Sequence, residues 1–304
     1  MRTMLFMPVR LRASVATITL KGLERLLNED RDVFVIFYDD NEEFPETSAL
    51  LHEFCRSRRG RANILSRLEG LARSEHSRSG PNRGWSTSTV DRIIEIKNHG
   101  IRNALEENFD YAFLLDADMI PHPRLIHRLI ECEADIVAGI TWTRFHREAP
   151  LMPNCWDYQT YNFRSAESII RLRVSGVYEV GGLAAATLYS RRALIAGVCF
   201  SRIPNLEMWG EDKHLSVRAA CLGFRLFVCT DFPLFHMYRD DEVQVGEKWL
   251  SWGCPATYIQ DQLNEHWEAE IRKWWSRSQR APEGSLRRKM AGRLRWLANL
   301  LDPK

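Results

Sequence analysis

Uninterrupted apolar runs alternate with helical patterns along the first half of the chain. Buried strands are predicted at four such runs, residues 4–9, 33–38, 111–115 and 136–140. Apolar residues recur at helical spacing from Val15 to Leu27, and a second helix is predicted from Thr89 to Leu105. This alternation favours an α/β fold with a mainly parallel sheet, helices on both faces and ligands at the carboxyl ends of the strands.

The pattern becomes irregular after Ile140. Five aromatic residues are spread through a polar stretch, namely Trp142, Trp156, Tyr158, Tyr161 and Phe163. They contact a ligand or pack within the fold, and the pattern leaves both alternatives open. Strand-like residues return at Val177, and a later strand is predicted at residues 224–229, followed by a turn around Pro233. From about Ile259 the chain is predicted to be helical and becomes basic.

Composition narrows the class of protein. A chain of 304 residues with 45% hydrophobic content can bury a full core. Its 42 basic and 40 acidic residues give a net charge of +2, which argues against a nucleic-acid binder. The seven cysteines include no C-x-x-C pair, and reduced thiols without a recognisable signal peptide predict a cytoplasmic protein. The sequence contains no run of about 18 apolar residues, so no membrane-spanning segment is predicted.

The sharpest chemical feature is an apolar strand that ends in two carboxylates, FLLDAD at residues 113–118. Burial of Asp116 and Asp118 without partners would be costly, so the chain is expected to leave the sheet at Asp116. The two acids can then address one ligand, one toward a ribose and one toward a divalent cation. Carboxylate oxygens suit Mg²⁺ and Mn²⁺, especially where phosphate oxygens complete the shell. A strand-to-helix turn with an Asp cap is the alternative.

Four segments in this order resemble the family 2 glycosyltransferases and their GT-A relatives. They are FVIFYDDNEE, LLDADMIPHPRLIHRL, WGEDKHLSVRAACLGFRLFV and FHMYR, and the resemblance covers roughly residues 1–240. It implies a GT-A catalytic domain over residues 1–255, with a nucleotide-sugar-binding half (1–140) and an acceptor-binding half (141–255). A basic helical extension is expected over residues 256–304.

The resemblance assigns nucleotide-sugar contacts in the first half. Asp39 and Asp40 end the second strand, where such enzymes hold the base and ribose, and Pro8 follows the first strand as in many relatives. Asn41 and Glu42 depart from the Gly and Ser that often follow the paired acids. A turn with solvated acids is the alternative for Asp39 and Asp40.

In the D-x-D motif, Asp118 resembles the cation ligand and Asp116 the residue that orients the ribose or a neighbouring basic side chain. Ala117 between them is expected at the donor. His236 matches the late metal histidine of several relatives, although a lone histidine is more often structural. Arg239 is expected to meet the charge that develops on the departing diphosphate.

The acceptor side is assigned to a short acidic motif. The resemblance makes Asp212 the general base, Glu211 a residue that orients the acceptor, and Trp209 a face for a sugar ring. Two acids at a helix N-terminus are also favoured by the helix dipole, which is the structural alternative. Gly182 is expected to let a sugar approach the backbone closely.

Together these residues predict an enzyme, a glycosyltransferase that uses Mn²⁺ or Mg²⁺. The donor is a nucleoside-diphosphate sugar, with UDP slightly favoured by family frequency, and the acceptor is a saccharide, a lipid-linked sugar or a small molecule. The reaction is predicted to be inverting, with Asp212 as base. A retaining enzyme and a non-catalytic nucleotide-sugar-binding protein stay as alternatives. A nucleotidyltransferase is disfavoured, because residues 4–14 contain no glycine for a phosphate loop.

The end of the chain carries one apolar helical stripe of Leu286, Met290, Leu294, Leu297 and Leu301. Basic residues occupy much of its remaining surface, and Trp296 adds an interfacial aromatic. This helix is predicted to lie on an anionic membrane surface, or to pack against the catalytic domain or a second subunit in a homo-oligomer.

Overall fold

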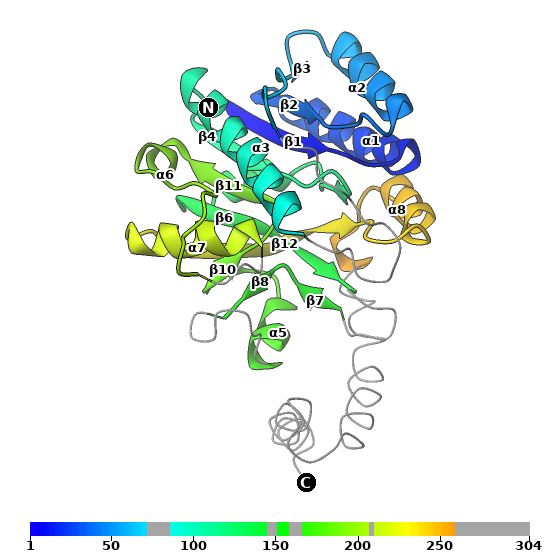
Figure 1. Cartoon of the computed structure of the whole chain (residues 1–304). Helices are drawn as coiled ribbons and strands as arrows, with labels where there is room; N and C mark the ends of the chain where they lie inside the picture. Colours follow the sequence, from blue (N-terminus) through cyan, green and yellow to red (C-terminus); the bar gives the residue numbers. More distant parts are fainter. Residues whose placement is uncertain (72–85, 145–150, 158–165, 207–209, 259–304) are drawn as a thin grey trace, which may run out of the picture.

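A computed structural model describes residues 1–71, 86–144, 151–157, 166–206 and 210–258. Trp209 and the predicted C-terminal helix lie outside these ranges. Within them, a central sheet of ten strands is covered by helices on both faces (Figure 1), which confirms the predicted α/β fold. No helix of this part of the chain is long and apolar enough to cross a bilayer.

The strands of the first half form a parallel block. They are β1 (Thr3–Val9), β2 (Val33–Asp39), β3 (Ala62–Ile64) and β4 (Tyr111–Leu114), in the order β3-β2-β1-β4. The central strands are continuous apolar runs because both of their faces are buried. The four apolar runs chosen from the sequence all become strands, with ends that differ by a few residues.

The chain after β4 adds strands of mixed direction. These later strands, two of which begin before residue 141, are β5 (Met119–Ile120), β6 (Ile136–Thr143), β7 (Met152–Pro153), β9 (Val177–Val180), β11 (Thr187–Ser190) and β12 (Leu226–His236). β11 runs antiparallel between β4 and β6, and β12 lies parallel to β6. The sheet is therefore mixed rather than mainly parallel, because the regular strand–helix alternation that produces parallel neighbours ends at β4. A small separate sheet pairs β8 (Cys155–Trp156) with β10 (Gly182–Leu183).

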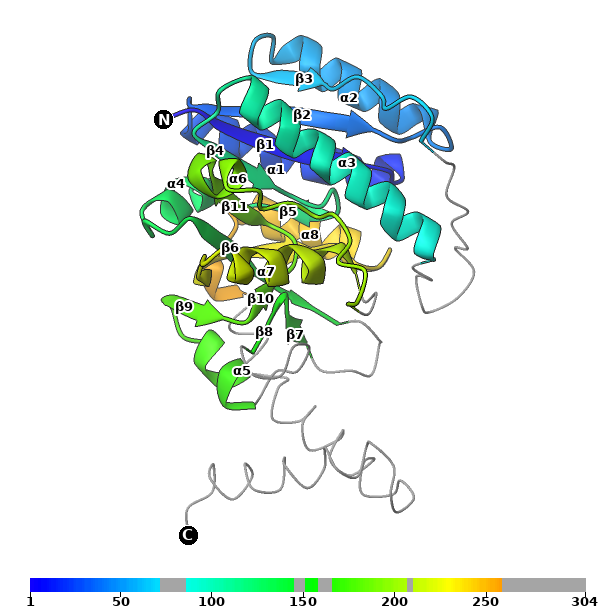
Figure 2. The same ribbon diagram turned by 60° about the vertical axis from the view of Figure 1, so that its left-hand side comes forward.

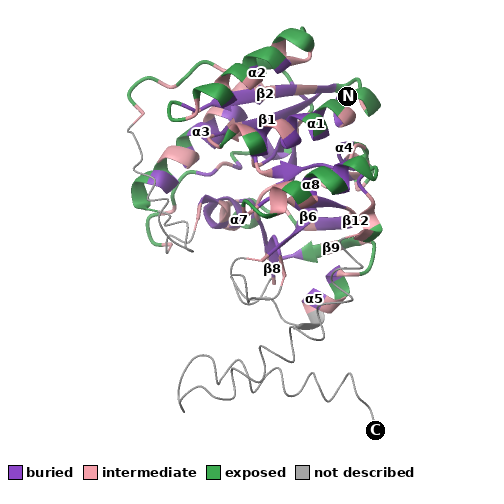
Figure 3. Cartoon of the chain, turned by 90° about the vertical axis from the view of Figure 1, so that its right-hand side faces the viewer, coloured by how far each residue is buried: buried purple, intermediate pink, exposed green. Residues whose placement is uncertain are grey.

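Two layers of helices cover the sheet (Figure 2). One face carries α1 (Ala13–Glu29), α2 (Pro45–Ser57) and α4 (Leu125–Ile130), and the other carries α3 (Thr87–Glu106), α6 (Arg191–Ile195) and α7 (Glu211–Cys221). α8 (Glu242–Ser251) packs against α1, and α5 (Ala166–Leu172) lies near β7. Figure 3 shows buried strands between the two helical layers.

Pro8 lies inside β1 and not after it, which corrects the expectation from the sequence. β1 pairs with β4 only as far as Phe6, whose carbonyl accepts a hydrogen bond from the Leu115 N–H. Pro8, two residues further on, faces the same side of β1, beyond the end of β4. The strand therefore tolerates a proline, because its missing N–H would have no partner there.

The predicted turn at Pro233 is also absent, since β12 continues to His236. Its register against β6 shifts between Cys229, which pairs with Gly139, and Leu234, which pairs with Thr141. This irregularity accommodates the proline within the strand. As a result, His236 pairs with Met119 of β5, directly after the D-x-D motif.

Candidate active site

The D-x-D motif forms the tight turn between β4 and β5. β4 ends at Leu114, and the Met119 N–H donates to the carbonyl of Asp116. Ala117 is buried, and its carbonyl accepts a hydrogen bond of 2.7 Å from the hydroxyl of Thr19 on α1. The middle residue thus fixes the turn to the core, and the chain leaves the sheet at Asp116 as predicted.

Asp118 and His236 lie side by side at this turn. Nε2 of His236 is 3.3 Å from Oδ1 of Asp118, and the Met237 N–H donates to the carbonyl of Asp118 at 2.8 Å. On the other side of the ring, Nδ1 of His236 is 2.7 Å from the hydroxyl oxygen of Thr143 on β6. Two residues far apart in sequence are therefore joined at the end of the sheet.

The chemistry of this pair fits a divalent cation that also binds the substrate. It offers one carboxylate and one imidazole, and Thr143 can accept the Nδ1 proton, which leaves Nε2 as the coordinating atom. Among the described residues, no group of three or more His, Cys, Asp or Glu side chains is arranged to hold a metal ion. Any cation at Asp118 and His236 would thus depend on further oxygens, and Mg²⁺ commonly takes these from substrate phosphates.

A second cluster centres on Lys97 of α3, whose side chain is only 4% exposed. Its Nζ lies 2.6 Å from Oε1 of Glu211, 3.5 Å from Oδ1 of Asp116 and 3.6 Å from Oδ1 of Asp212. The cluster brings the first acid of the D-x-D motif to the two acids of α7. Three site residues predicted from the sequence thus meet at one ammonium group.

Lys97 itself was missed in the sequence. Its signal is that it occupies the buried stripe of an amphipathic helix, between Val90, Ile94 and Ile101 at spacings of three or four residues. A buried lysine is rarely found without paired charges. A lysine on such a stripe therefore indicates acidic partners elsewhere in the chain.

The two acids at the start of α7, Glu211 and Asp212, differ in their exposure to solvent. The helix begins after Gly210, whose φ of 137° favours glycine, so Glu211 and Asp212 lie within the first turn and not before it. The side chain of Glu211 is 5% exposed, whereas those of Asp212 and Asp116 keep 22% and 42%. Asp212 can therefore be reached by a ligand, while Glu211 is closed off against Lys97.

Electrostatics in this cluster are strongly coupled. Partial burial removes water from the carboxyl group of Asp212, and this loss of solvation raises its pKa well above the usual range. Lys97 opposes the rise, and the carboxylates of Glu211 and Asp116 add to it. Burial disfavours the charged form of Lys97, but its three acidic neighbours outweigh burial and raise its pKa well above the ordinary value.

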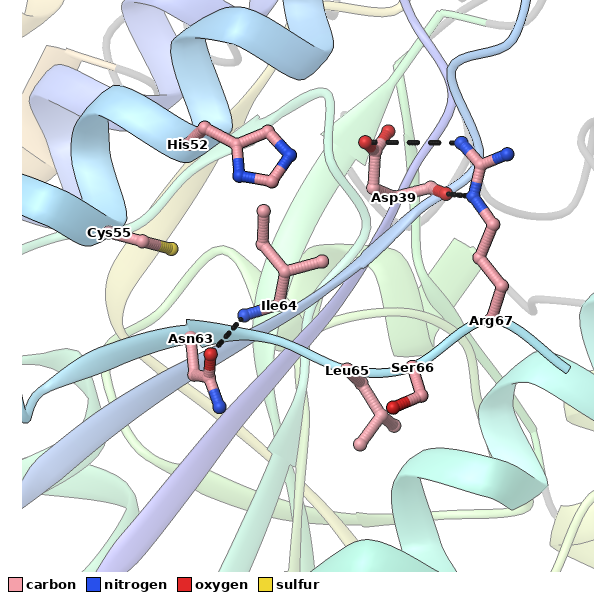
Figure 4. A pocket seen from close by; sticks show the side chains of 8 residues that line it. All are labelled: Asp39, His52, Cys55, Asn63, Ile64, Leu65, Ser66 and Arg67. Atoms are coloured by element: carbon pink, nitrogen blue, oxygen red, sulfur yellow. Dashed lines mark hydrogen bonds and ion pairs between the residues drawn. The ribbon is translucent and has the colours of Figure 1, made fainter.

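The carboxyl end of β2 lies two strands away from β4. Asp39 is buried there and accepts hydrogen bonds from the side chains of Asn41 and Ser48 at 2.9 and 2.7 Å. It lines a pocket of about 510 Å³ together with residues 63–67 and side chains of α2 (Figure 4). Asp40 instead forms an ion pair with Arg92 of α3, at 2.9 Å from Nε. Asp39 is thus held rigidly beside an open pocket.

Two further predicted residues have structural partners. The guanidinium of Arg239 binds the carboxylate of Glu242 at 2.5 Å and the carbonyl of Arg144 at 2.7 Å, which fixes the chain between β12 and α8. At Gly182, a Cβ atom would overlap the indole ring of Trp156 on the paired strand. Glycine is therefore needed there to make room for Trp156.

Comparisons with known proteins agree with this architecture. The central α/β sheet with flanking helices is that of the GT-A glycosyltransferases, which are enzymes. The chain belongs to the glycosyltransferase-like family 2, whose family model matches residues 81–273. A comparison with curated proteins gave no match.

Two solved structures match the chain, and the first of them is similar in fold. The structure of GalNAc-T7 with UDP, GalNAc and Mn²⁺ has a TM-score of 0.52 and 13% identity, over 78% of this chain and 44% of that chain. The crystal structure of A197 from STIV has a TM-score of 0.42 and 15% identity, over 79% of this chain and 87% of that chain. The chain thus spans less than half the length of the GalNAc-T7 structure.

Proposed function

We propose that this glycosyltransferase is metal-dependent and inverting, with a UDP-sugar as donor and Asp212 as general base. The observation that carries the proposal is the contact between Asp118 and His236, because it places a carboxylate and an imidazole together beside the ribose-side acid Asp116. The presence of UDP and Mn²⁺ in the GalNAc-T7 structure supports the same choice of nucleotide and metal.

The donor would lie along the carboxyl ends of β2, β1 and β4. The nucleobase of the donor would enter the pocket beside Asp39, whose carboxylate is held in place by Asn41 and Ser48. The ribose reaches Asp116, which keeps 42% of its exposure although Lys97 lies beside it. Asp40 contributes indirectly, because its ion pair with Arg92 fixes α3 to the end of β2.

The diphosphate would lie at Asp118 and His236. A cation held by these two residues would stabilise the negative charge that the leaving diphosphate acquires. The hydroxyl oxygen of Thr143 would accept a hydrogen bond from Nδ1–H of His236 and keep the ring turned toward Asp118. Arg239 would act at longer range, since Glu242 and a backbone carbonyl already occupy its guanidinium group.

The acceptor would approach the first turn of α7. Asp212 accepts the proton of the attacking hydroxyl on one carboxylate oxygen, because it is the reachable acid of the pair. Glu211 holds Lys97 and does not touch the acceptor. Inversion follows if Asp212 and the leaving group lie on opposite faces of the sugar, so the anomeric configuration of the product separates this reading from a retaining one.

A panel of donors tests the proposal. We expect one of UDP-glucose, UDP-galactose, UDP-GlcNAc, UDP-GalNAc or GDP-mannose to raise the melting temperature in the presence of MnCl₂ and much less in EDTA. If a GDP-sugar gives the largest increase in melting temperature, the proposed nucleotide is GDP and not UDP. If no member of the panel stabilises the protein with Mn²⁺, the metal-dependent donor site is wrong.

A further inference from the structure

We infer that Lys97 is a positioning residue, which opposes protonation of the proposed base Asp212 and ties it to the donor-side acid Asp116. This inference rests on the proposed role of Asp212. It assigns to α3 a part in the reaction that none of the acidic motifs reveals.

The geometry joins three elements at one buried group. Lysine has three N–H donors, and the Nζ of Lys97 faces Glu211, Asp212 and Asp116 at 2.6, 3.6 and 3.5 Å. Its ammonium also lies 5.1 Å from the ring centre of Phe200. The shortest contact is to Glu211, the least exposed of the three acids, so Glu211 fixes the position of Lys97. The ammonium group of Lys97 then contacts the two more exposed acids, Asp116 and Asp212, from the buried side.

The backbone of α3 fixes the position of this lysine. Gly100 lies three residues after Lys97, and a Cβ atom there would overlap the ring of Phe6 on β1. The helix therefore rests directly on the central strand. Because Phe6 is fully buried, the helix has no room to move toward the sheet, and Lys97 projects from a rigid support.

The charges that face Asp212 have opposite effects on its proton affinity. They are Lys97 from α3, Glu211 on its own helix and Asp116 at the end of β4, and the uncharged hydroxyl of Tyr189 on β11 also faces Asp212. Of these four groups, only Lys97 carries a positive charge. The two carboxylates favour a proton on Asp212, and Lys97 disfavours it. Without Lys97, Asp212 would stay protonated up to a higher pH than in the wild type, and over that added pH range it could not act as a base.

The test compares the pH dependence of kcat in Lys97→Met and Lys97→Arg. Release of nucleoside diphosphate is measured with MnCl₂ and the panel sugar that turns over fastest. In Lys97→Met, we expect the acidic limb of the profile to move up by about one to three pH units, so that activity lost near neutral pH returns in alkaline buffer. Lys97→Arg keeps the charge and should keep the limb close to its original position.

Controls separate this role from loss of folding. Lys21→Met removes an exposed lysine that pairs with Glu247, and it should leave the profile unchanged. Thermal melts establish that each variant is folded. If Lys97→Met does not fold, the double variant Lys97→Met/Glu211→Gln is compared with Glu211→Gln, since the pair loses one charge of each sign.

The outcomes distinguish the inference from the proposed function. A folded Lys97→Met, or the folded double variant, whose acidic limb does not move overturns the role of Lys97 alone. A limb that moves upward and is restored by Lys97→Arg supports it. A wild-type protein that releases no nucleoside diphosphate from any panel sugar overturns the proposed function, and this inference falls with it.

Discussion

At the scale of single residues, exposure decides which acid can do chemistry. Glu211 and Asp212 are neighbours in one turn of α7, yet only Asp212 remains accessible. Both acids sit where the helix dipole favours negative charge, so their position at the helix start does not by itself imply catalysis. The two acids differ in exposure because the carboxylate of Glu211 is buried against the ammonium group of Lys97.

Replacement of Asp212 by Asn keeps the shape of the side chain and removes the base. We expect kcat to fall by about 10²-fold or more, the scale of a positioned general base, while donor binding persists. Calorimetry with UDP and MnCl₂ measures binding, and product release measures kcat. Glu53→Gln on the exposed surface of α2 serves as a control. Near-normal turnover in Asp212→Asn would return this acid to a structural role.

Thr143→Val removes the hydroxyl that meets Nδ1 of His236. The imidazole then loses its fixed tautomer and orientation, so we expect the affinity for Mn²⁺ in the presence of UDP to weaken by about 10- to 100-fold. Titration of Mn²⁺ against donor turnover measures this. Thr143→Ser keeps the hydroxyl and should behave like the wild type. Equal Mn²⁺ affinity in Thr143→Val would show that His236 does not depend on this contact.

The positions of several residues could be predicted from the sequence, and others could not. Asp116 and Asp118 follow an apolar strand, and their exit from the sheet is a local consequence of buried charge. Lys97 and Arg92 act through acids that are distant in the chain, and Glu211 lies 114 positions after Lys97. A single sequence shows the lysine on its stripe but not the partners that the fold brings to it.

At the scale of elements, local patterns predicted where strands and helices lie, but they did not predict the direction of the later strands in the sheet. The apolar runs of β1, β2, β4 and β6 are recognisable because both of their faces are covered. The antiparallel insertion of β11 depends on pairing between distant segments, which no local pattern encodes. The same holds for β12, whose pairing with β6 before and after Pro233, and with β5 at Phe235 and His236, overrides the turn tendency of the proline.

Gly100→Ala tests how closely α3 lies on β1. Helix propensity alone predicts a gain of about 1 kcal/mol in the free energy of unfolding. The overlap with the buried ring of Phe6 should outweigh it, because overpacking costs about 1 to 3 kcal/mol. Urea unfolding measures the difference, and Arg102→Ala on the exposed side of α3 should change stability by only about 0.5 kcal/mol. A more stable Gly100→Ala would contradict the close contact.

At the scale of the whole molecule, the sheet unites the segments that the sequence divided into a donor half and an acceptor half. β11 of the second half lies between β4 and β6, so the D-x-D turn and α7 are parts of one continuous framework. The C-terminal segment lies outside the described residues, and its contact with a membrane or a second subunit stays a prediction. Co-sedimentation with anionic vesicles at low and high salt separates these two cases.

We propose that Asp118 and His236 bind a cation that is needed for reaction of a nucleotide sugar. Release of nucleoside diphosphate from the donor panel, measured with MnCl₂ and with EDTA for the wild type and Asp118→Ala, tests it most directly. We predict release by the wild type with Mn²⁺, loss of release in EDTA, and loss in Asp118→Ala even with Mn²⁺, while that variant keeps its fold. Release that persists in EDTA, or a fully active Asp118→Ala, would contradict the account.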